Sequence, residues 1–176
     1  MSTAGSKLQS RLAELRRQFD DGFARPQQIL LAPGERMLAI TVAGEPLAVR
    51  VAETSGLAVL KANISPVPSS VPELLGLTGV RGAVVPVFSL AALLNSALRE
   101  SEPRWLLFAG RQSLVAFAFG QLEHQFEAEA AQVFPQAGHY GRYVSETVRD
   151  GTRLRCLIRL GALAEHIRNR GSKNSL

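Results

Sequence analysis

The stretch Gly76–Leu90 contains the residue types of a protein contact surface rather than those of a catalytic centre. Glycines recur every third residue at its start, and Arg81 is its only charged residue. Glycine suits backbone positions that need a positive φ or a close approach. An arginine fixed at such a turn has no catalytic partners nearby, but it makes a good directed contact with another protein. The stretch therefore predicts docking chemistry.

Other residues that could do chemistry lack partners at useful spacing. The three histidines, His124, His139 and His166, are far apart and have no H-x-x-x-H or C-x-x-C companions, so no metal or cofactor site is predicted. No nucleophile elbow or phosphate-binding loop is present. Glu123 beside His124 allows an acid–base pair, although surface charge is the favoured interpretation. Cys156 lies in a strand-like run and is interpreted as a buried, unreactive thiol. The chain is predicted not to be an enzyme.

The composition of the chain limits the kinds of partner and the cellular location that we expect. A chain of 176 residues that is 46% hydrophobic and 20% charged fits one folded domain. The net charge of +5 is spread along the chain without a nucleic-acid recognition signature, so nucleic-acid binding is not expected, whereas acidic protein surfaces fit. No secretory signal is visible, and the longest uncharged run, Gly82–Leu98, is too short and too polar to span a membrane. A cytoplasmic protein without membrane insertion is predicted.

The elements that must position these residues are mostly strands between two terminal helices. Leucines and phenylalanines at spacings of three and four predict an amphipathic helix over 6–23, which packs on its own domain or docks onto a partner or a second copy. Leu160–Arg168 reads as a C-terminal helix, and 89–98 as a short one. The predicted strands cover 38–42, 47–51, 57–60, 83–88, 105–108, 114–119, 142–148 and 153–158.

Local chemistry refines two parts of this division. Within the strand over 83–88, Pro86 limits ladder hydrogen bonding and indicates a sheet edge or a strand switch. The chain as a whole divides into an arm over 1–33, a β-rich body over 34–168 and a flexible tail over 169–176. Pattern alone predicts a mainly β body, a sandwich or barrel, with terminal helices.

The glycine-rich stretch also carries a family resemblance. Its glycine, arginine and proline spacing resembles the signature of CheW-type chemotaxis coupling proteins, G-V-x-N-L-R-G-x-V-x-P-V-x-D-L, and the preceding Ile64–Pro68 is similar to the family's I-x-x-V-P. The match extends loosely over 34–166. The matching signature residues are Gly76, Arg81, Gly82, Pro86 and Leu90.

The resemblance implies a fold and a function. The implied fold is two small, intertwined, five-stranded SH3-like β-barrels with a hydrophobic seam between them. The implied function is a non-enzymatic adaptor between the regulatory domain of a CheA-type histidine kinase and the cytoplasmic tip of a chemoreceptor. Gly76, Arg81 and Gly82 become candidates for the receptor-side surface, while Pro86 matches but more plainly shapes its strand. For Arg81 a structural salt bridge is the alternative.

Four positions depart from the family pattern. Gly79 replaces its Asn, Ser89 and Gly120 replace two Asp residues, and Gly56 replaces a Glu in an early strand. These losses indicate a divergent member, and the added N-terminal helix is similar to coupling proteins of type IV pilus (twitching-motility) systems. They also leave open a second function class, a stand-alone interaction domain that binds another regulator without assembling a receptor array.

Overall fold

The computed structural model describes residues 34–60, 64–96, 102–110, 114–135 and 143–173. Residues Gly34–Leu176 form one compact unit and Met1–Pro33 form another. The helix expected over 6–23, and the whole arm over 1–33, lie outside the described residues. All described elements belong to the second unit.

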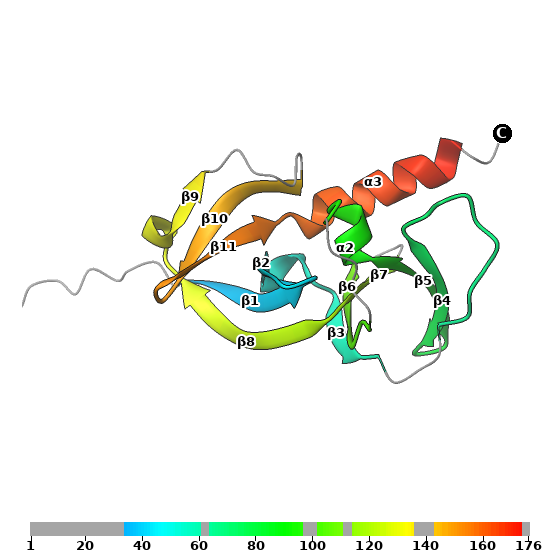
Figure 1. Cartoon of the computed structure of the whole chain (residues 1–176), viewed down its shortest axis with the longest axis horizontal. Coiled ribbons are helices and arrows are strands. Elements are labelled where there is room, and N and C mark those ends of the chain that lie inside the picture. Colours follow the sequence, from blue (N-terminus) through cyan, green and yellow to red (C-terminus); the bar gives the residue numbers. More distant parts are fainter. Residues whose placement is uncertain (1–33, 61–63, 97–101, 111–113, 136–142, 174–176) are drawn as a thin grey trace, which may run out of the picture. The chain divides into compact units, whose positions relative to one another are not determined.

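This unit is mainly β and contains two sheets, as the sequence predicts (Figure 1). One sheet comprises β1 (Glu35–Val42), β2 (Glu45–Arg50), β8 (Gln121–Ala128), β9 (Val133–Pro135), β10 (Val144–Asp150) and β11 (Arg153–Ile158), in the order β8-β1-β2-β11-β10-β9. The other comprises β3 (Gly56–Val59), β4 (Leu74–Val80), β5 (Ala83–Ser89), β6 (Trp105–Ala109) and β7 (Val115–Phe119), in the order β3-β6-β7-β5-β4. The first sheet thus has six strands where five were expected, because the three-residue β9 adds an edge strand.

The two sheets are intertwined along the chain. β1 and β2 precede the five-stranded sheet in sequence, whereas β8 to β11 follow it. β11 closes this arrangement by lying parallel to β2, with Cys156 opposite Leu47. The six-stranded sheet is therefore assembled from both ends of the described chain, as the resemblance implies.

An apolar seam joins the two sheets. Ile40 of β1 and Phe117 of β7 belong to one buried cluster to which both sheets contribute. Because side chains alternate along a strand, Met37 of β1 faces the other way and lies in a second cluster within the six-stranded sheet. Val85 of β5 belongs to a third cluster within the five-stranded sheet. The cluster shared by both sheets is the hydrophobic seam that the resemblance implies. The other two clusters show that strands of each sheet are also buried on their second face.

Four short helices complete the described unit. They are η1 (Val51–Glu53), α2 (Leu90–Leu93), η2 (Ala130–Gln132) and α3 (Leu160–Lys173). α2 is shorter than the helix expected over 89–98, and Asn95, with φ +53°, follows its last turn. α3 continues past the expected end at Arg168, so the tail expected from residue 169 begins inside this helix. In the part of the chain that the structure describes, no helix has the length and apolar character required to cross a bilayer.

Candidate functional site

The glycine-rich stretch forms a β-hairpin rather than a turn followed by a strand. Gly76 and Gly79 lie within β4, and the turn comes later, at Arg81 and Gly82, whose φ angles are +49° and +82°. Val80 pairs with Ala83 across this two-residue loop. Positive φ at both loop positions is the mark of a type I′ turn, whose twist matches that of the two strands. The chain therefore holds Arg81 at the tip of a rigid hairpin.

The two strands of the hairpin that carries Arg81 also have exposed apolar side chains. Val84 alternates with the buried Val85 along β5 and is 72% exposed. Leu75, at a bulge of β4, adds a second exposed apolar side chain, 37% exposed. Arg81 is itself exposed and forms no ion pair with any residue that the structure describes, so a structural salt bridge does not account for it there. A cation without an ion-pair partner among the described residues, on a hairpin with exposed apolar side chains, is suited to contact with another protein.

Gly76 has a backbone role. It is buried, its φ is +145°, and a Cβ built on it would overlap the carbonyl oxygen of Ser65. Ser65 and Leu77 exchange two backbone hydrogen bonds, of 2.8 and 2.9 Å, which attach the segment after β3 to the outer edge of β4. Gly76 therefore permits the close approach that links the two edges of the five-stranded sheet. A partner contact by Gly76 or Gly82 stays a prediction.

Pro86 sits where β5 changes from an edge to a central strand. Residues Ala83–Pro86 pair with β4 only, and pairing with β7 begins at Val87. Leu77, opposite Pro86, directs its backbone groups to Ser65 on the far side of β4. The two residues thus form a pair without mutual hydrogen bonds, so the missing N–H of Pro86 removes no bond to β4. Of the two alternatives that the sequence indicates, this position agrees with the sheet edge, because β5 stays within one sheet.

Two of the departures from the family pattern have different structural consequences. Ser89 is the N-cap of α2, and its hydroxyl accepts a 3.2 Å hydrogen bond from the amide of Ala92. Serine and aspartate cap helices about equally well, so this replacement preserves the local role. Gly79 is exposed, with nothing within 4 Å of where a Cβ would lie. Its lost side chain is therefore one that could have reached a partner.

Glu123 of β8 belongs to a buried ion-pair network that sequence reasoning missed. Arg155 of β11 is 2% exposed and donates to both carboxylate oxygens of Glu123, at 2.9 and 2.7 Å. Its Nε donates to Asp150 at 2.8 Å, and the Thr41 hydroxyl donates to Glu123 at 2.6 Å. The network ties β8, β1, β10 and β11 together. The alternation of Leu122, Phe126 and Ala128 with polar residues was the available signal for β8.

The same network shows how Glu123 and His124, the acid–base pair considered from the sequence, are arranged. His124 Nε2 lies 3.0 Å from Asp150, so the carboxylate that it contacts is that of Asp150 rather than that of Glu123. Burial opposes ionisation of Asp150, but hydrogen bonds from Arg155 and His124 outweigh it and lower the pKa of this carboxyl. Both carboxylates are thus held as anions by Arg155, which suits structure rather than proton transfer. His139 lies outside the described residues, and the described ones contain no metal-ligating cluster.

The Cys156 thiol is half-buried, and burial raises its pKa. A raised pKa keeps the thiol protonated and weakly nucleophilic, in agreement with the interpretation from the sequence.

The network predicts a loss of stability in acid. Hydrogen bonds from Arg155 hold the pKa of Glu123 at about 2, against an ordinary value of 4.5, although burial opposes the shift. Because the folded-state pKa is depressed, this contribution is complete above about pH 4.5 and is lost as the pH falls toward 2. We expect the urea midpoint to decline over that interval, and to decline less in Glu123→Gln. The exposed-site variant Glu127→Gln should retain the native pH profile; an unchanged profile in Glu123→Gln would contradict the assignment.

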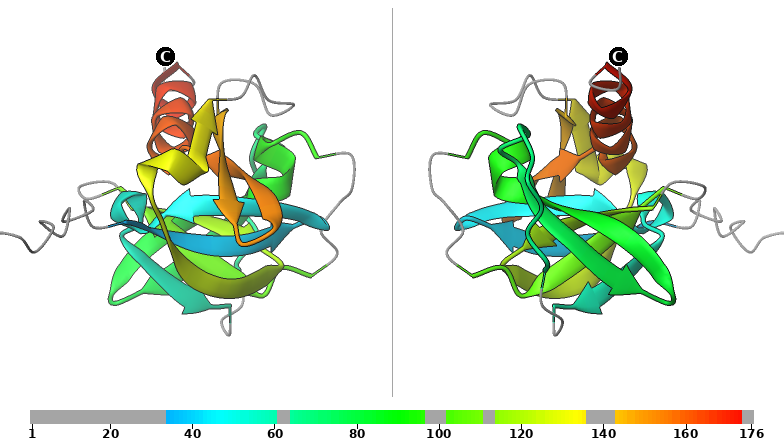
Figure 2. Two further views of the ribbon diagram at one scale, coloured as in Figure 1. Left: turned by 90° about the vertical axis from the view of Figure 1, so that its left-hand side faces the viewer. Right: turned by 90° about the vertical axis from the view of Figure 1, so that its right-hand side faces the viewer.

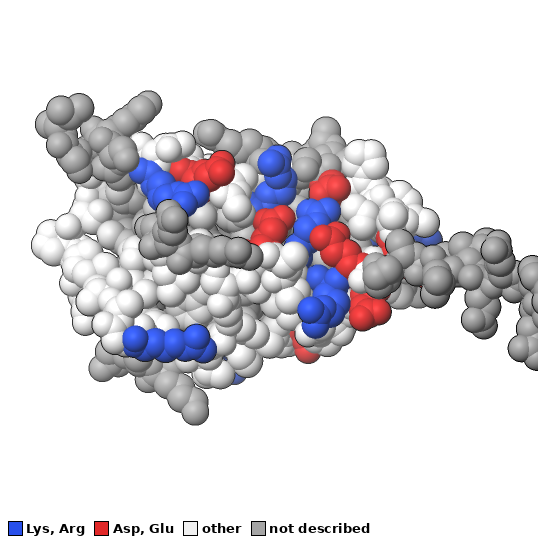
Figure 3. All heavy atoms as spheres, turned by 180° about the vertical axis from the view of Figure 1, so that it is seen from behind, with Lys and Arg blue, Asp and Glu red and all other residues white. Residues whose placement is uncertain are grey.

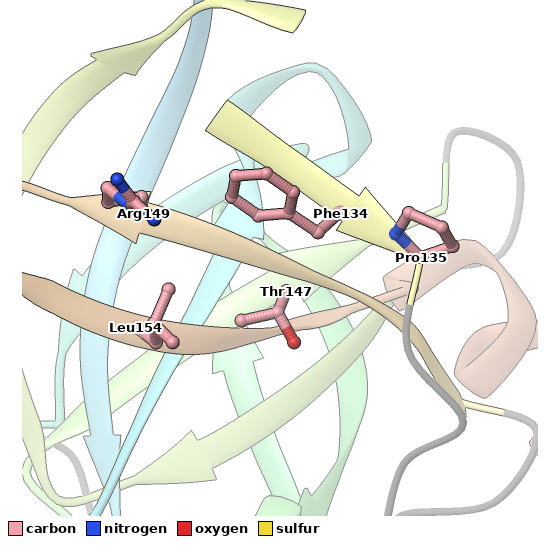
Figure 4. A pocket seen from close by; sticks show the side chains of 5 residues that line it. All are labelled: Phe134, Pro135, Thr147, Arg149 and Leu154. Carbon is pink, nitrogen blue, oxygen red and sulfur yellow. The ribbon is translucent and has the colours of Figure 1, made fainter. Parts of the chain in front are cut away.

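A second exposed apolar area lies on the six-stranded sheet. Phe134 of β9 and Leu154 of β11 are 38% and 56% exposed, and they line a shallow depression of about 390 Å³ with Pro135, Thr147 and Arg149 (Figure 4). The Arg149 guanidinium carbon lies 5.5 Å from the centre of the Phe134 ring, a cation–π distance. We call this area the β9–β11 patch. In Figure 2, the strands β9, β10 and β11 lie toward the viewer in the left-hand view, whereas β4 and β5 lie toward the viewer in the right-hand view.

Charge is distributed unevenly between the two sheets. Seen from behind, basic and acidic side chains alternate over the six-stranded sheet, and the surface of the five-stranded sheet is largely uncharged (Figure 3). Part of the alternation comes from Arg50, whose guanidinium pairs with Glu35 at 3.0 Å and Glu146 at 2.8 Å. Much of the charge on this sheet is therefore paired within the protein. The hairpin combines little charge with exposed apolar side chains.

The two-sheet architecture is that of a known domain family. The CheW-like domain family matches residues 36–168, so the chain belongs to this family. Among solved structures, the scaffolding protein TtCheW from Thermoanaerobacter tengcongensis is similar, with a TM-score of 0.65 and 11% identity over 72% of this chain and 89% of that one. This likeness concerns the fold. No curated protein matches the sequence.

Proposed function

We propose that the protein is a non-enzymatic cytoplasmic adaptor that couples a chemoreceptor to a CheA-type histidine kinase. Membership of the CheW-like family supports an adaptor in chemotaxis-type signalling. The observation that carries the proposal is the β4–β5 hairpin, which has Arg81 at its turn, without an ion-pair partner among the described residues, and the exposed Val84 in β5. In this proposal the hairpin contacts the cytoplasmic tip of the receptor. The pathway of this adaptor is chemotaxis or pilus motility, and the resemblance of the arm over 1–33 to coupling proteins of type IV pilus systems favours the second.

An adaptor must engage two partners at once, which requires two surfaces. The hairpin belongs to the five-stranded sheet and the β9–β11 patch to the six-stranded sheet. The strands that carry them lie toward the viewer in opposite views of the molecule, so in this proposal a partner on one surface leaves the other uncovered (Figure 2). We assign the β9–β11 patch to the regulatory domain of the kinase. Coupling then needs no turnover, since binding both partners links their conformational equilibria.

Charge reversal and apolar-to-acidic changes test the two surfaces separately. Arg81→Glu and Val84→Asp should weaken receptor-tip binding about tenfold or more and leave kinase binding unchanged, because contact residues at an interface centre carry most of the energy. Leu154→Asp should have the opposite selectivity. All three side chains are exposed, so thermal midpoints should stay within about 2 °C of native. Titrations by calorimetry and thermal melts provide the measurements.

The matched control is Arg168→Glu, which makes the same charge change at an exposed position of α3 and should alter neither affinity. A midpoint lowered by many degrees in Arg81→Glu would make that residue structural. Loss of both partners in a single variant would remove the two-surface assignment. If the native chain binds neither partner at about 50 μM, the adaptor proposal fails.

The second candidate is a stand-alone interaction domain that binds another regulator. The exposed Gly79 favours it, because the family's side chain at this outward-facing position is missing. In that case Gly79→Asn should restore kinase or receptor binding that the native chain lacks. If the native chain binds both partners, the replacement is neutral and the first proposal stands.

A further inference from the structure

The outer edge of β3 is the least protected sheet edge in the part of the chain that the structure describes. The other edges belong to β4, β8 and β9. β4 is covered at Ser65, and β9 ends in Pro135, which has no N–H to donate. β8 carries the charged Glu123 and His124. β3 pairs with β6 only, and its residues, Gly56–Val59, include neither a charge nor a proline. Because proteins use such devices to keep sheet edges from pairing, an edge without them is a candidate interface.

The backbone of β3 leaves hydrogen-bonding groups on this open side. The amide of Leu60, which continues the register of β3, donates to the carbonyl of Arg104 at 2.8 Å. Hydrogen-bonded and non-hydrogen-bonded pairs alternate along an antiparallel ladder. Ala58 therefore also bonds to β6, whereas Leu57 and Val59 direct their N–H and C=O groups away from it. Within the described residues these outward groups have no partner, so they are available to another strand.

The side chains of the same two residues are apolar and exposed. Leu57 is 37% and Val59 46% exposed, and both lie on one face of the strand because side chains alternate. The Glu of the family pattern is replaced here by Gly56, so the charge that would protect this edge is absent. The strand offers main-chain groups beside two apolar side chains. It has no charged or polar side chain that would select an unlike strand.

We propose that β3 pairs antiparallel with β3 of a second copy of this chain, so that two five-stranded sheets become one continuous sheet. The two-fold axis passes between the two Ala58 residues, which places Leu57 of each copy opposite Val59 of the other. The outward N–H and C=O groups of Leu57 and Val59 then exchange hydrogen bonds across the axis. Their side chains contact each other as cross-strand apolar pairs.

A second copy fits this edge because the strand is complementary to itself. In the two-fold register every exposed apolar side chain of β3 meets an apolar side chain, and no like charges meet. Each copy has a net charge of +5, which opposes association, but the surface of the five-stranded sheet is largely uncharged in the view of Figure 3. The pairing uses no residue of the β4–β5 hairpin or of the β9–β11 patch, so it stands or falls independently of the adaptor proposal.

Sedimentation equilibrium of the full chain at about 10–500 μM tests the pairing. We expect a monomer–dimer equilibrium with a Kd of about 100 μM, which is weak because strands of four residues bury less area than a standard interface. Two-dimensional NMR at increasing concentration should show shifts that are largest at the amides of Leu57 and Val59, because their N–H groups gain an acceptor. The amide of Ala58, which already bonds to β6, should shift less.

Charged substitutions test both the edge and its register. Leu57→Lys and Val59→Glu should each weaken self-association at least about tenfold, because a charge replaces an apolar contact. An equimolar mixture of the two variants should associate within about threefold of the native Kd, since the introduced lysine lies opposite the introduced glutamate. Ala92→Lys, the matched control, introduces a charge at an exposed position of α2 and should leave the native Kd unchanged.

Four outcomes would overturn the proposal. The first two are a monomer up to about 500 μM and self-association that both charged variants leave unchanged. The third is a mixture that associates no better than either variant alone, because the two-fold register would then be wrong. The fourth is protection of the Leu57 and Val59 amides from solvent exchange in the most dilute sample, which would show that another segment of this chain covers the edge. Should a variant fail to fold, the concentration-dependent shifts of the native chain still decide.

Discussion

Gly76→Ala is expected to lower the free energy of unfolding by about 3 kcal/mol or more, the largest effect of any single methyl group added to the hairpin. The position has φ +145°, which side-chain-bearing residues rarely adopt, and strain of this kind costs about 1–3 kcal/mol. The added Cβ would also overlap the carbonyl of Ser65, which cannot withdraw without breaking its two bonds to Leu77. Urea denaturation followed by circular dichroism measures the change.

Gly79→Ala is the matched control in the same strand. Its Cβ would meet nothing within 4 Å, so the free energy of unfolding should change by less than about 1 kcal/mol. If the two variants were equally stable, the link between Ser65 and β4 would not depend on Gly76. The expected difference also bears on partner binding, since Gly76 variants would lose affinity through unfolding, whereas Arg81 variants would lose it while folded.

Arg155→Met is expected to destabilise the protein by about 3–5 kcal/mol. The substitution keeps an apolar stem but leaves Glu123 and Asp150 as buried or half-buried carboxylates without their shared cation. Removing one partner of a buried pair costs more than the pair contributes, because the remaining charge is left unsolvated. Thermal and urea denaturation at pH 7 provide the measurement.

Two further variants control this prediction. Arg153→Met removes a cation that also reaches Glu123, at 3.4 Å, but its side chain is 59% exposed, so the cost should be below about 1 kcal/mol. Adding Glu123→Leu to Arg155→Met should recover part of the lost stability, because the unpaired carboxylate is gone. A double variant less stable than Arg155→Met would contradict this account, because Glu123 would then be stabilised by groups other than Arg155.

Local sequence signals predicted most of the locally paired strands, but β4 was missed because its glycines were interpreted as turn positions although it pairs with β5 across a two-residue loop. The hairpins over β1–β2, β6–β7 and β10–β11 follow from alternation and turn residues at short range. β9 was missed because three residues give no period, and it exists only by pairing with Thr147. β8 was missed because its charged residues resemble a solvated loop until Arg155, from the far end of the chain, neutralises Glu123. α3 continues past Arg168, where the sequence was predicted to leave the helix, because no helix-terminating residue directly follows Arg168.

The candidate site was predicted in part, for a related reason. The arginine and its turn are local features, so Arg81 and Gly82 could be identified from spacing. Which apolar residues stay exposed is decided by the packing of the whole sheet, and Val84 and Val85 look alike in sequence although one is 72% and the other 1% exposed. The hydrogen bond from Arg170 to Glu73 likewise depends on α3, which lies nearly a hundred residues further along the chain.

The pairing of β11 with β2 has a consequence for biosynthesis. Leu47 and Cys156 are more than a hundred residues apart, so on the ribosome β2 emerges long before the strand that completes its sheet. β3 to β7 are made in between and form a sheet of their own with shorter separations. Until the last strands are released, β1 and β2 present an open edge and their apolar faces, the condition under which nascent chains need protection from aggregation. A chain truncated before β11 would keep that exposed edge permanently.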